Sequence, residues 1–86
     1  MKAVIVMKED KSLTINDKVA SITVKPVVVF DSMQHATSWL HTMRYNYFKD
    51  KSIRVIDYTD NILTIRLPLS VIRYYVVVTD YICEGE

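Results

Sequence analysis

The chain of 86 residues contains a single glycine, Gly85, so every other turn has to be made without one. Asparagine and aspartate are the residues that best tolerate the left-handed backbone conformation of tight turns. The expected reversal points are therefore Glu9-Asp10, Asn16-Asp17 and Asp60-Asn61. The stretches between them are rich in valine and isoleucine, which favour strands. The sequence thus predicts a fold built from β-hairpins.

The first hairpins follow from alternation of apolar and polar residues. Residues 2–8 are apolar on both faces, which is typical of a central strand. After a charged turn, Leu13 and Ile15 are expected to face Ile22 and Ala20, so that the apolar side chains of this hairpin share one side.

One helix is predicted after the first strands. Pro26 cannot donate a ladder hydrogen bond and indicates a bend or an edge position before a short strand over residues 27–30. Asp31 or Ser32 is the expected N-cap, with Gln34 in capping-box position after Asp31. The helix should span about residues 32–45, because apolar residues recur at helical spacing. They are Ala36, Leu40, Met43 and Tyr47, flanked by Met33 and Trp39.

A second hairpin is expected around Asp60-Asn61, with strands that pair through a two-residue turn. Pro68 should end its second strand, and the β-branched and aromatic run 71–83 should form a long last strand with a bulge or bend. A helix from Pro68 to Tyr75 is the alternative, which the β-branched residues disfavour. The predicted pairs on one face are Tyr58–Leu63, Ile56–Ile65 and Arg54–Leu67, and on the other Thr59–Ile62, Asp57–Thr64 and Val55–Arg66.

These elements predict an α+β fold in which residues 1–86 form one domain. Its mainly antiparallel sheet of about six or seven strands carries one helix, about residues 32–45, on one face. The strand at 71–83 is either central or an edge, and as an edge it would tend to pair with another chain. Because half of the residues are hydrophobic in so short a chain, a homodimer that shares an apolar face or a continuous sheet is also expected.

Composition and charge exclude several classes of function. Eleven Lys and Arg against ten Asp and Glu give a net charge of +1, so neither a basic nucleic-acid surface nor an acidic surface dominates. The single cysteine, Cys83, and the absence of zinc-site spacing predict a reducing compartment, the cytoplasm, with no metal or cofactor. No segment is long enough to span a membrane.

Catalytic residues are not expected either. His35 and His41 lie roughly 240° apart around a helix, so they cannot hold one metal ion together. Ser38 and His41 share a helix face, but no oxyanion donor or glycine-rich elbow accompanies them. An exposed polar face explains both residues.

Cations alternate with aromatic residues in two stretches, and three interpretations are open. In the first, the tyrosines close the core and the cations interact favourably with the helix C-terminus. In the second, these residues are hot spots of a protein interface. In the third, they bind single-stranded nucleic acid. The near-zero net charge favours a protein partner over nucleic acid. The candidate partner-binding residues are Trp39, Arg44, Tyr45, Tyr47, Phe48, Lys49, Arg73, Tyr74 and Tyr75.

The sequence therefore predicts a small non-enzymatic protein-binding module. In size and build it is similar in general style to the small accessory proteins with which phages and mobile elements block host machinery, which implies an inhibitor or modulator of a larger protein. The alternative is a small nucleic-acid-binding protein that uses the aromatic and basic cluster at the end of the helix. A third hypothesis, a small enzyme or ligand-binding domain, would need a pocket near His41 at a dimer interface.

Overall fold

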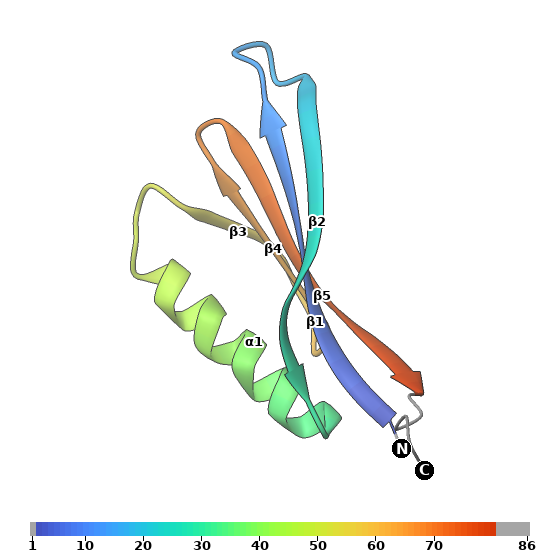
Figure 1. Ribbon diagram of the computed structural model, residues 1–86. Coiled ribbons are helices and arrows are strands. Elements are labelled where there is room, and N and C mark those ends of the chain that lie inside the picture. The colour runs from blue at the N-terminus through green and yellow to red at the C-terminus, as the bar shows by residue number, and fades with distance from the viewer. Residues whose placement is uncertain (1, 81–86) are drawn as a thin grey trace.

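A computed structural model describes residues 2–80, so Cys83 and the end of the predicted last strand lie outside the described residues. Within that range the elements are β1 (Lys2–Leu13), β2 (Val19–Phe30), α1 (Met33–Phe48), β3 (Arg54–Tyr58), β4 (Ile62–Leu67) and β5 (Ser70–Asp80). The strands form one antiparallel sheet in the order β2-β1-β5-β4-β3, and α1 lies across one of its faces (Figure 1). The fold is α+β, as predicted, but residues 2–80 contain five strands rather than six or seven.

The strand count is lower because β1 continues through the predicted turn at Glu9-Asp10. That prediction is wrong, since β1 is hydrogen-bonded on both sides and Asp10 lies opposite Thr23 in β2 and Ile72 in β5. A ladder on each side satisfies the backbone groups that a turn would otherwise leave to solvent. Ile15 was also expected in a strand facing Ala20, but it lies in the β1–β2 turn with 91% of its surface exposed.

The first reversal occurs instead at Asn16-Asp17, as predicted. Asp17 has a φ of 62°, the left-handed conformation that aspartate tolerates, and its N–H donates to the carbonyl of Thr14 at 2.9 Å. The predicted strands at 20–24 and 27–30 are one strand, β2. Pro26 is accommodated because β2 is an edge strand, and the register with β1 shifts beside it.

The helix begins at the second of the two predicted N-caps, so the capping box expected from Asp31 and Gln34 does not form. Ser32 is the N-cap, and its hydroxyl accepts a hydrogen bond from the backbone N–H of His35 at 3.3 Å. The helix ends at Phe48, later than expected. Among the described residues, no helix is long and apolar enough to cross a membrane.

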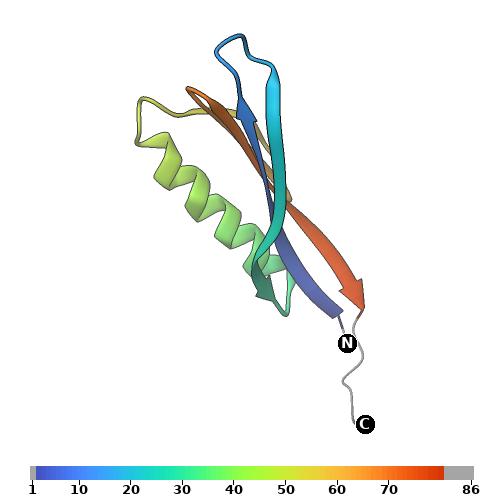
Figure 2. The same cartoon turned by 45° about the horizontal axis from the view of Figure 1, so that its top comes forward.

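The core lies between α1 and the sheet, and Figure 2 shows that the helix covers one side of the strands only. β5 occupies the centre of the sheet between β1 and β4, which settles the open question about its position. The long, apolar edge strand of the sheet is therefore β2. The buried core residues are Val4, Val6, Ala36, Leu40, Leu63, Ile65, Ile72 and Tyr74.

The β3–β4 hairpin turns at Asp60-Asn61, and two predicted pairs beside the turn, Tyr58–Leu63 and Asp57–Thr64, are confirmed. Farther from the turn the predicted register is wrong by one residue, because Ile56 forms a bulge. Bulges are common in edge strands such as β3. The pairs beyond it are Val55–Ile65 and Arg54–Arg66, in place of Ile56–Ile65, Val55–Arg66 and Arg54–Leu67.

Candidate functional site

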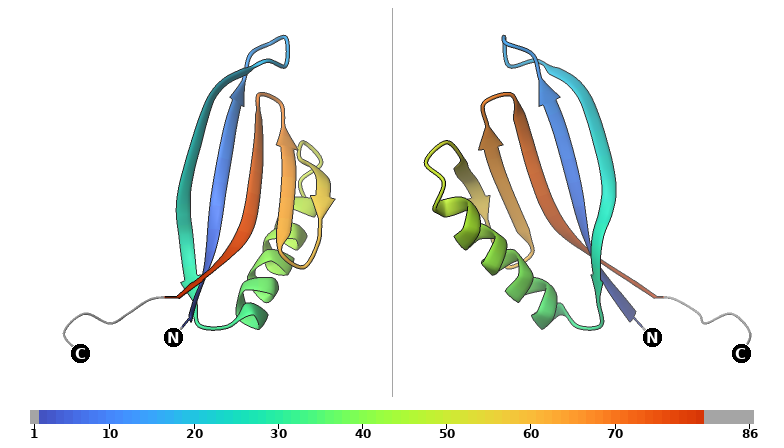
Figure 3. Two further views of the ribbon diagram at one scale, coloured as in Figure 1. Left: turned by 90° about the vertical axis from the view of Figure 1, so that its right-hand side faces the viewer. Right: turned by 60° about the vertical axis from the view of Figure 1, so that its left-hand side comes forward.

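The face of the sheet opposite α1 is covered by no other element of residues 2–80, and we call it the open face (Figure 3). Strand alternation places Ile5 on this face between Val29 of β2 and Val77 of β5. Val29 is 60% exposed and Val77 39% exposed. Aliphatic side chains from three neighbouring strands thus meet at the solvent.

This apolar region continues along the three long strands. Met7 lies between Pro26 and Tyr75, and the next exposed aliphatic residues on β2 are Val24 and Ile22. With about 3.3 Å per residue and about 4.8 Å between strands, the part of the open face formed by β2, β1 and β5 measures roughly 550 Å². Glu9 of β1 and Arg73 of β5 also lie on this face, so the aliphatic residues occupy only part of that area.

A hollow lies at the end of the open face near the start of β1. Its volume is about 850 Å³, and Ala3, Ile5, Val29 and Thr79 are among the residues that line it. Volumes of this order are typical of ligand pockets. The apolar face is therefore concave at this end.

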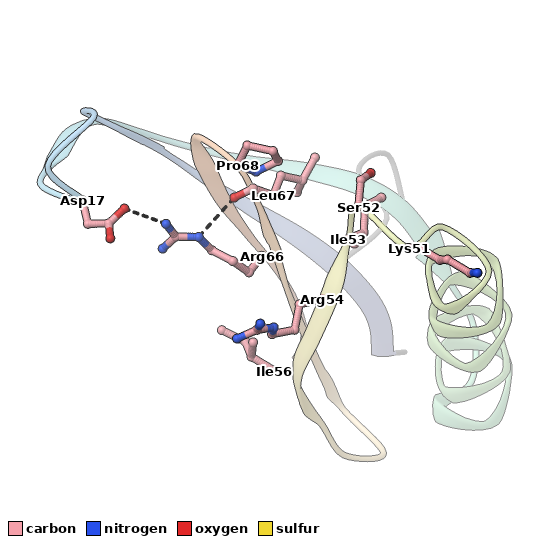
Figure 4. Close-up of a pocket in the computed structure, with 9 residues that line it drawn as sticks. All are labelled: Asp17, Lys51, Ser52, Ile53, Arg54, Ile56, Arg66, Leu67 and Pro68. Carbon is pink, nitrogen blue, oxygen red and sulfur yellow. Dashed lines mark hydrogen bonds and ion pairs between the residues drawn. The ribbon is translucent and has the colours of Figure 1, made fainter.

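A second pocket, of about 530 Å³, lies against the outer hairpin of the sheet (Figure 4). Arg54 and Arg66 project from adjacent strands to the same side of the hairpin, away from α1. The bulge at Ile56 causes this, because the predicted register would have placed Arg54 and Arg66 on opposite faces. The lining residues are Asp17, Lys51, Ser52, Ile53, Arg54, Ile56, Arg66, Leu67 and Pro68.

The two guanidinium groups of this pocket are unequally neutralised. Arg66 donates to the carboxylate of Asp17 at 2.6 Å and to the carbonyl of Leu67 at 3.1 Å. Arg54 makes no ion pair within the described part of the chain. Like charges directly opposite each other on neighbouring strands are destabilising. The repulsion between Arg54 and Arg66 therefore lowers the stability of the fold.

The residues predicted to bind a partner do not form one site, and three of them pack between helix and sheet. Tyr74 is only 4% exposed, and the edge of Trp39 packs on its ring with 5.4 Å between centroids. The hydroxyl groups of Tyr47 and Tyr74 are 3.1 Å apart. These three side chains belong to the core and its margin.

The other predicted residues lie in two separate places. At the end of α1, Tyr45 and Phe48 are exposed, and Nζ of Lys49 lies 4.4 Å from the centre of the Tyr45 ring. Arg44 turns back over the ring of Tyr58, at 4.7 Å. Arg73 and Tyr75 lie across the sheet from the helix, with the guanidinium 5.6 Å from the ring. Of the nine residues predicted to bind a partner, only Arg73 and Tyr75 lie on the open face.

The histidines are engaged separately. Nδ1 of His35 is 3.3 Å from the carboxylate of Asp31, and Nδ1 of His41 is 3.3 Å from the hydroxyl of Tyr58. Within residues 2–80, no group of three or more His, Cys, Asp or Glu side chains is placed to hold a metal ion.

No family model, curated protein or solved structure matches this chain. The function therefore has to be inferred from the surface itself, on which the open face and the Arg54–Arg66 pair are the two distinctive features. The sequence analysis missed Arg54 and Arg66. Their cross-strand juxtaposition depends on the bulge, for which the local sequence holds no signal.

The buried tyrosine couples the stability of this fold to alkaline pH. Burial raises the pKa of Tyr74 well above its ordinary value near 10, and the hydrogen bond with Tyr47 raises it further. Above about pH 10 the unfolded chain releases this proton while the folded chain retains it, so folding stability is lost as pH rises. Tyr74→Phe should lessen this loss by up to about 1.4 kcal/mol per pH unit, as measured by urea unfolding between about pH 9 and about pH 11. Equal slopes in the parent and Tyr74→Phe would contradict the assignment, and Tyr45→Phe is the matched control at an exposed site.

Proposed function

We propose that this chain is a non-enzymatic protein-binding module whose contact surface is the open face of the sheet. One observation carries the proposal: α1 covers one side of the sheet, whereas Ile5, Val29 and Val77 meet in register on the other. Exposed aliphatic side chains are stabilised by removal from water, and a partner that covers them supplies that burial.

The size and composition of the surface support this function. The roughly 550 Å² of the long strands, extended by β4, approaches the roughly 800 Å² that each partner contributes to a standard interface. Arg73 and Tyr75 lie at its centre and belong to residue types enriched at interface hot spots. The hollow beside Val29 is a place for an apolar side chain of the partner.

An inhibitor or modulator of a larger protein is the specific form of this proposal. A homodimer, in which the open face meets a second copy, is its symmetric form. Single-stranded nucleic acid is a second candidate, favoured by the stacked pair Arg73 and Tyr75 on the same face as Arg54 and Arg66. The exposed aliphatic residues on the β2 side of the same face, such as Val29, favour protein.

Val29→Lys separates these functions. A lysine in the middle of the apolar region adds a charge that a protein partner would have to desolvate, so capture of the partner should fall at least about tenfold. The same substitution adds a cation beside any phosphate backbone and should strengthen retention of nucleic acid. The experiment is affinity capture from nuclease-treated and untreated lysate with the parent, Val29→Lys, and Phe48→Lys at the exposed helix end as control.

The proposal predicts a nuclease-resistant partner that the parent and Phe48→Lys retain and Val29→Lys loses. Light scattering of the purified chain tests the symmetric form, with a dimer for the parent and a monomer for Val29→Lys. Capture that is equal in all three chains, or that depends on nucleic acid and increases in Val29→Lys, would sink the proposal.

A further inference from the structure

The structure places two arginines of adjacent strands on the same face, and we propose that they form a site for a carboxylate of the bound partner. This inference rests on the proposed function, because the carboxylate belongs to an acidic segment of the protein docked on the open face. Arg54 and Arg66 are the residues that would hold it.

The first argument is the charge that the fold leaves unneutralised. Arg54 and Arg66 are direct cross-strand partners, and the carboxylate of Asp17 pairs with Arg66 but not with Arg54. An incoming anion would relieve the repulsion between the guanidinium groups and accept hydrogen bonds from Arg54. Arginine is suited to this role because its planar fork binds carboxylates through two parallel hydrogen bonds.

The second argument concerns which anion is favoured. Asp17 already places a carboxylate on Arg66 at 2.6 Å, so the site is shown to accept that group within the chain itself. The rest of the lining includes Ile53, Ile56, Leu67 and Pro68, which suit apolar side chains flanking an acidic residue. A bare phosphate would gain nothing from such a lining.

The pocket is also continuous with the open face. Arg66 is the cross-strand neighbour of Val71, and Thr64 that of Arg73. Arg73 in turn lies opposite Glu9 at the centre of the sheet. A single partner chain that covers the open face therefore reaches the arginine pair along β4 and β5.

The test uses a defined probe, a fluorescein-labelled peptide of alternating glutamate and leucine, with fluorescence anisotropy at low salt. Arg54→Gln should weaken binding at least about tenfold, because a charge-assisted, two-point contact is lost. Arg54→Lys keeps the charge but not the planar guanidinium, so its affinity for the peptide should lie between those of the parent and of Arg54→Gln. Lys49→Gln removes the same charge from the helix end and should bind like the parent.

The inference is overturned if Arg54→Gln and Lys49→Gln bind the peptide equally, or if a matched glutamine–leucine peptide binds as well as the acidic one. It is also overturned if inorganic phosphate or oligodeoxythymidylate binds more tightly than the peptide. Capture with Val29→Lys separates the two proposals. If Val29→Lys loses capture but Arg54→Gln binds the peptide as well as the parent does, the carboxylate site alone is refuted. If Val29→Lys keeps capture but Arg54→Gln loses peptide binding, the proposed contact face alone is refuted.

Discussion

Val6→Asp should prevent the chain from folding. Val6 has no exposed surface and lies in the central strand β1 under the helix, so the substitution would place a carboxylate in the core without a partner. Burial of an unpaired charge destabilises by several kcal/mol, a large part of the roughly 5–15 kcal/mol that holds a small domain together. Far-UV circular dichroism and a proton NMR spectrum at neutral pH would show the loss of ordered structure.

The matched control is Val29→Asp, one strand away and on the other face. Val29 is 60% exposed, so its carboxylate would remain in water and the chain should fold. If Val29→Asp unfolds the chain as completely as Val6→Asp, the open face is buried in the native state, and the one-sided sheet described here is not the stable form.

Leu40→Ala should lower the free energy of unfolding by about 2–5 kcal/mol, as expected for a leucine deleted from a core. Leu40 is fully buried at the contact between α1 and the sheet, in the same cluster as Leu63 and Ile65. Its removal leaves a cavity beneath the helix. Urea unfolding followed by circular dichroism measures the change.

Met33→Ala, in the exposed first turn of the same helix, is the control and should change stability by less than about 1 kcal/mol. A loss below about 1 kcal/mol for Leu40→Ala would mean that the helix contributes little to the fold. The sheet would then have to be stabilised by other contacts.

Local sequence was sufficient for those parts of the fold that local chemistry controls. The turns at Asn16-Asp17 and Asp60-Asn61 depend on the residues in place, and both were predicted; the N-cap, Ser32, was one of two predicted positions. The charged run after Met7 was misread as a turn because its side chains are polar. The backbone there is paired on both sides, with the adjacent strand β2 and with β5 from a distant part of the sequence.

The candidate site was harder to predict for a related reason. Whether Arg54 faces the helix or the open face depends on one extra residue in β3, and a shift of one residue moves a side chain to the other face of a sheet. Arg73, Tyr74 and Tyr75 were predicted to act together because they are consecutive, but consecutive residues of a strand alternate between its two faces. Tyr74 is therefore a core residue, and its two neighbours lie on the open face.

The position of β1 has a consequence for how the chain acquires its structure during synthesis. β1 is made well before β5, and the two strands pair from Lys2 opposite Asp80 to Ser12 opposite Ser70. The middle of the sheet thus joins segments that are far apart in the sequence, and contacts of such long separation form slowly. Until β5 leaves the ribosome, the backbone groups of β1 that pair with β5 remain an open edge, and through this edge the nascent chain is prone to aggregate.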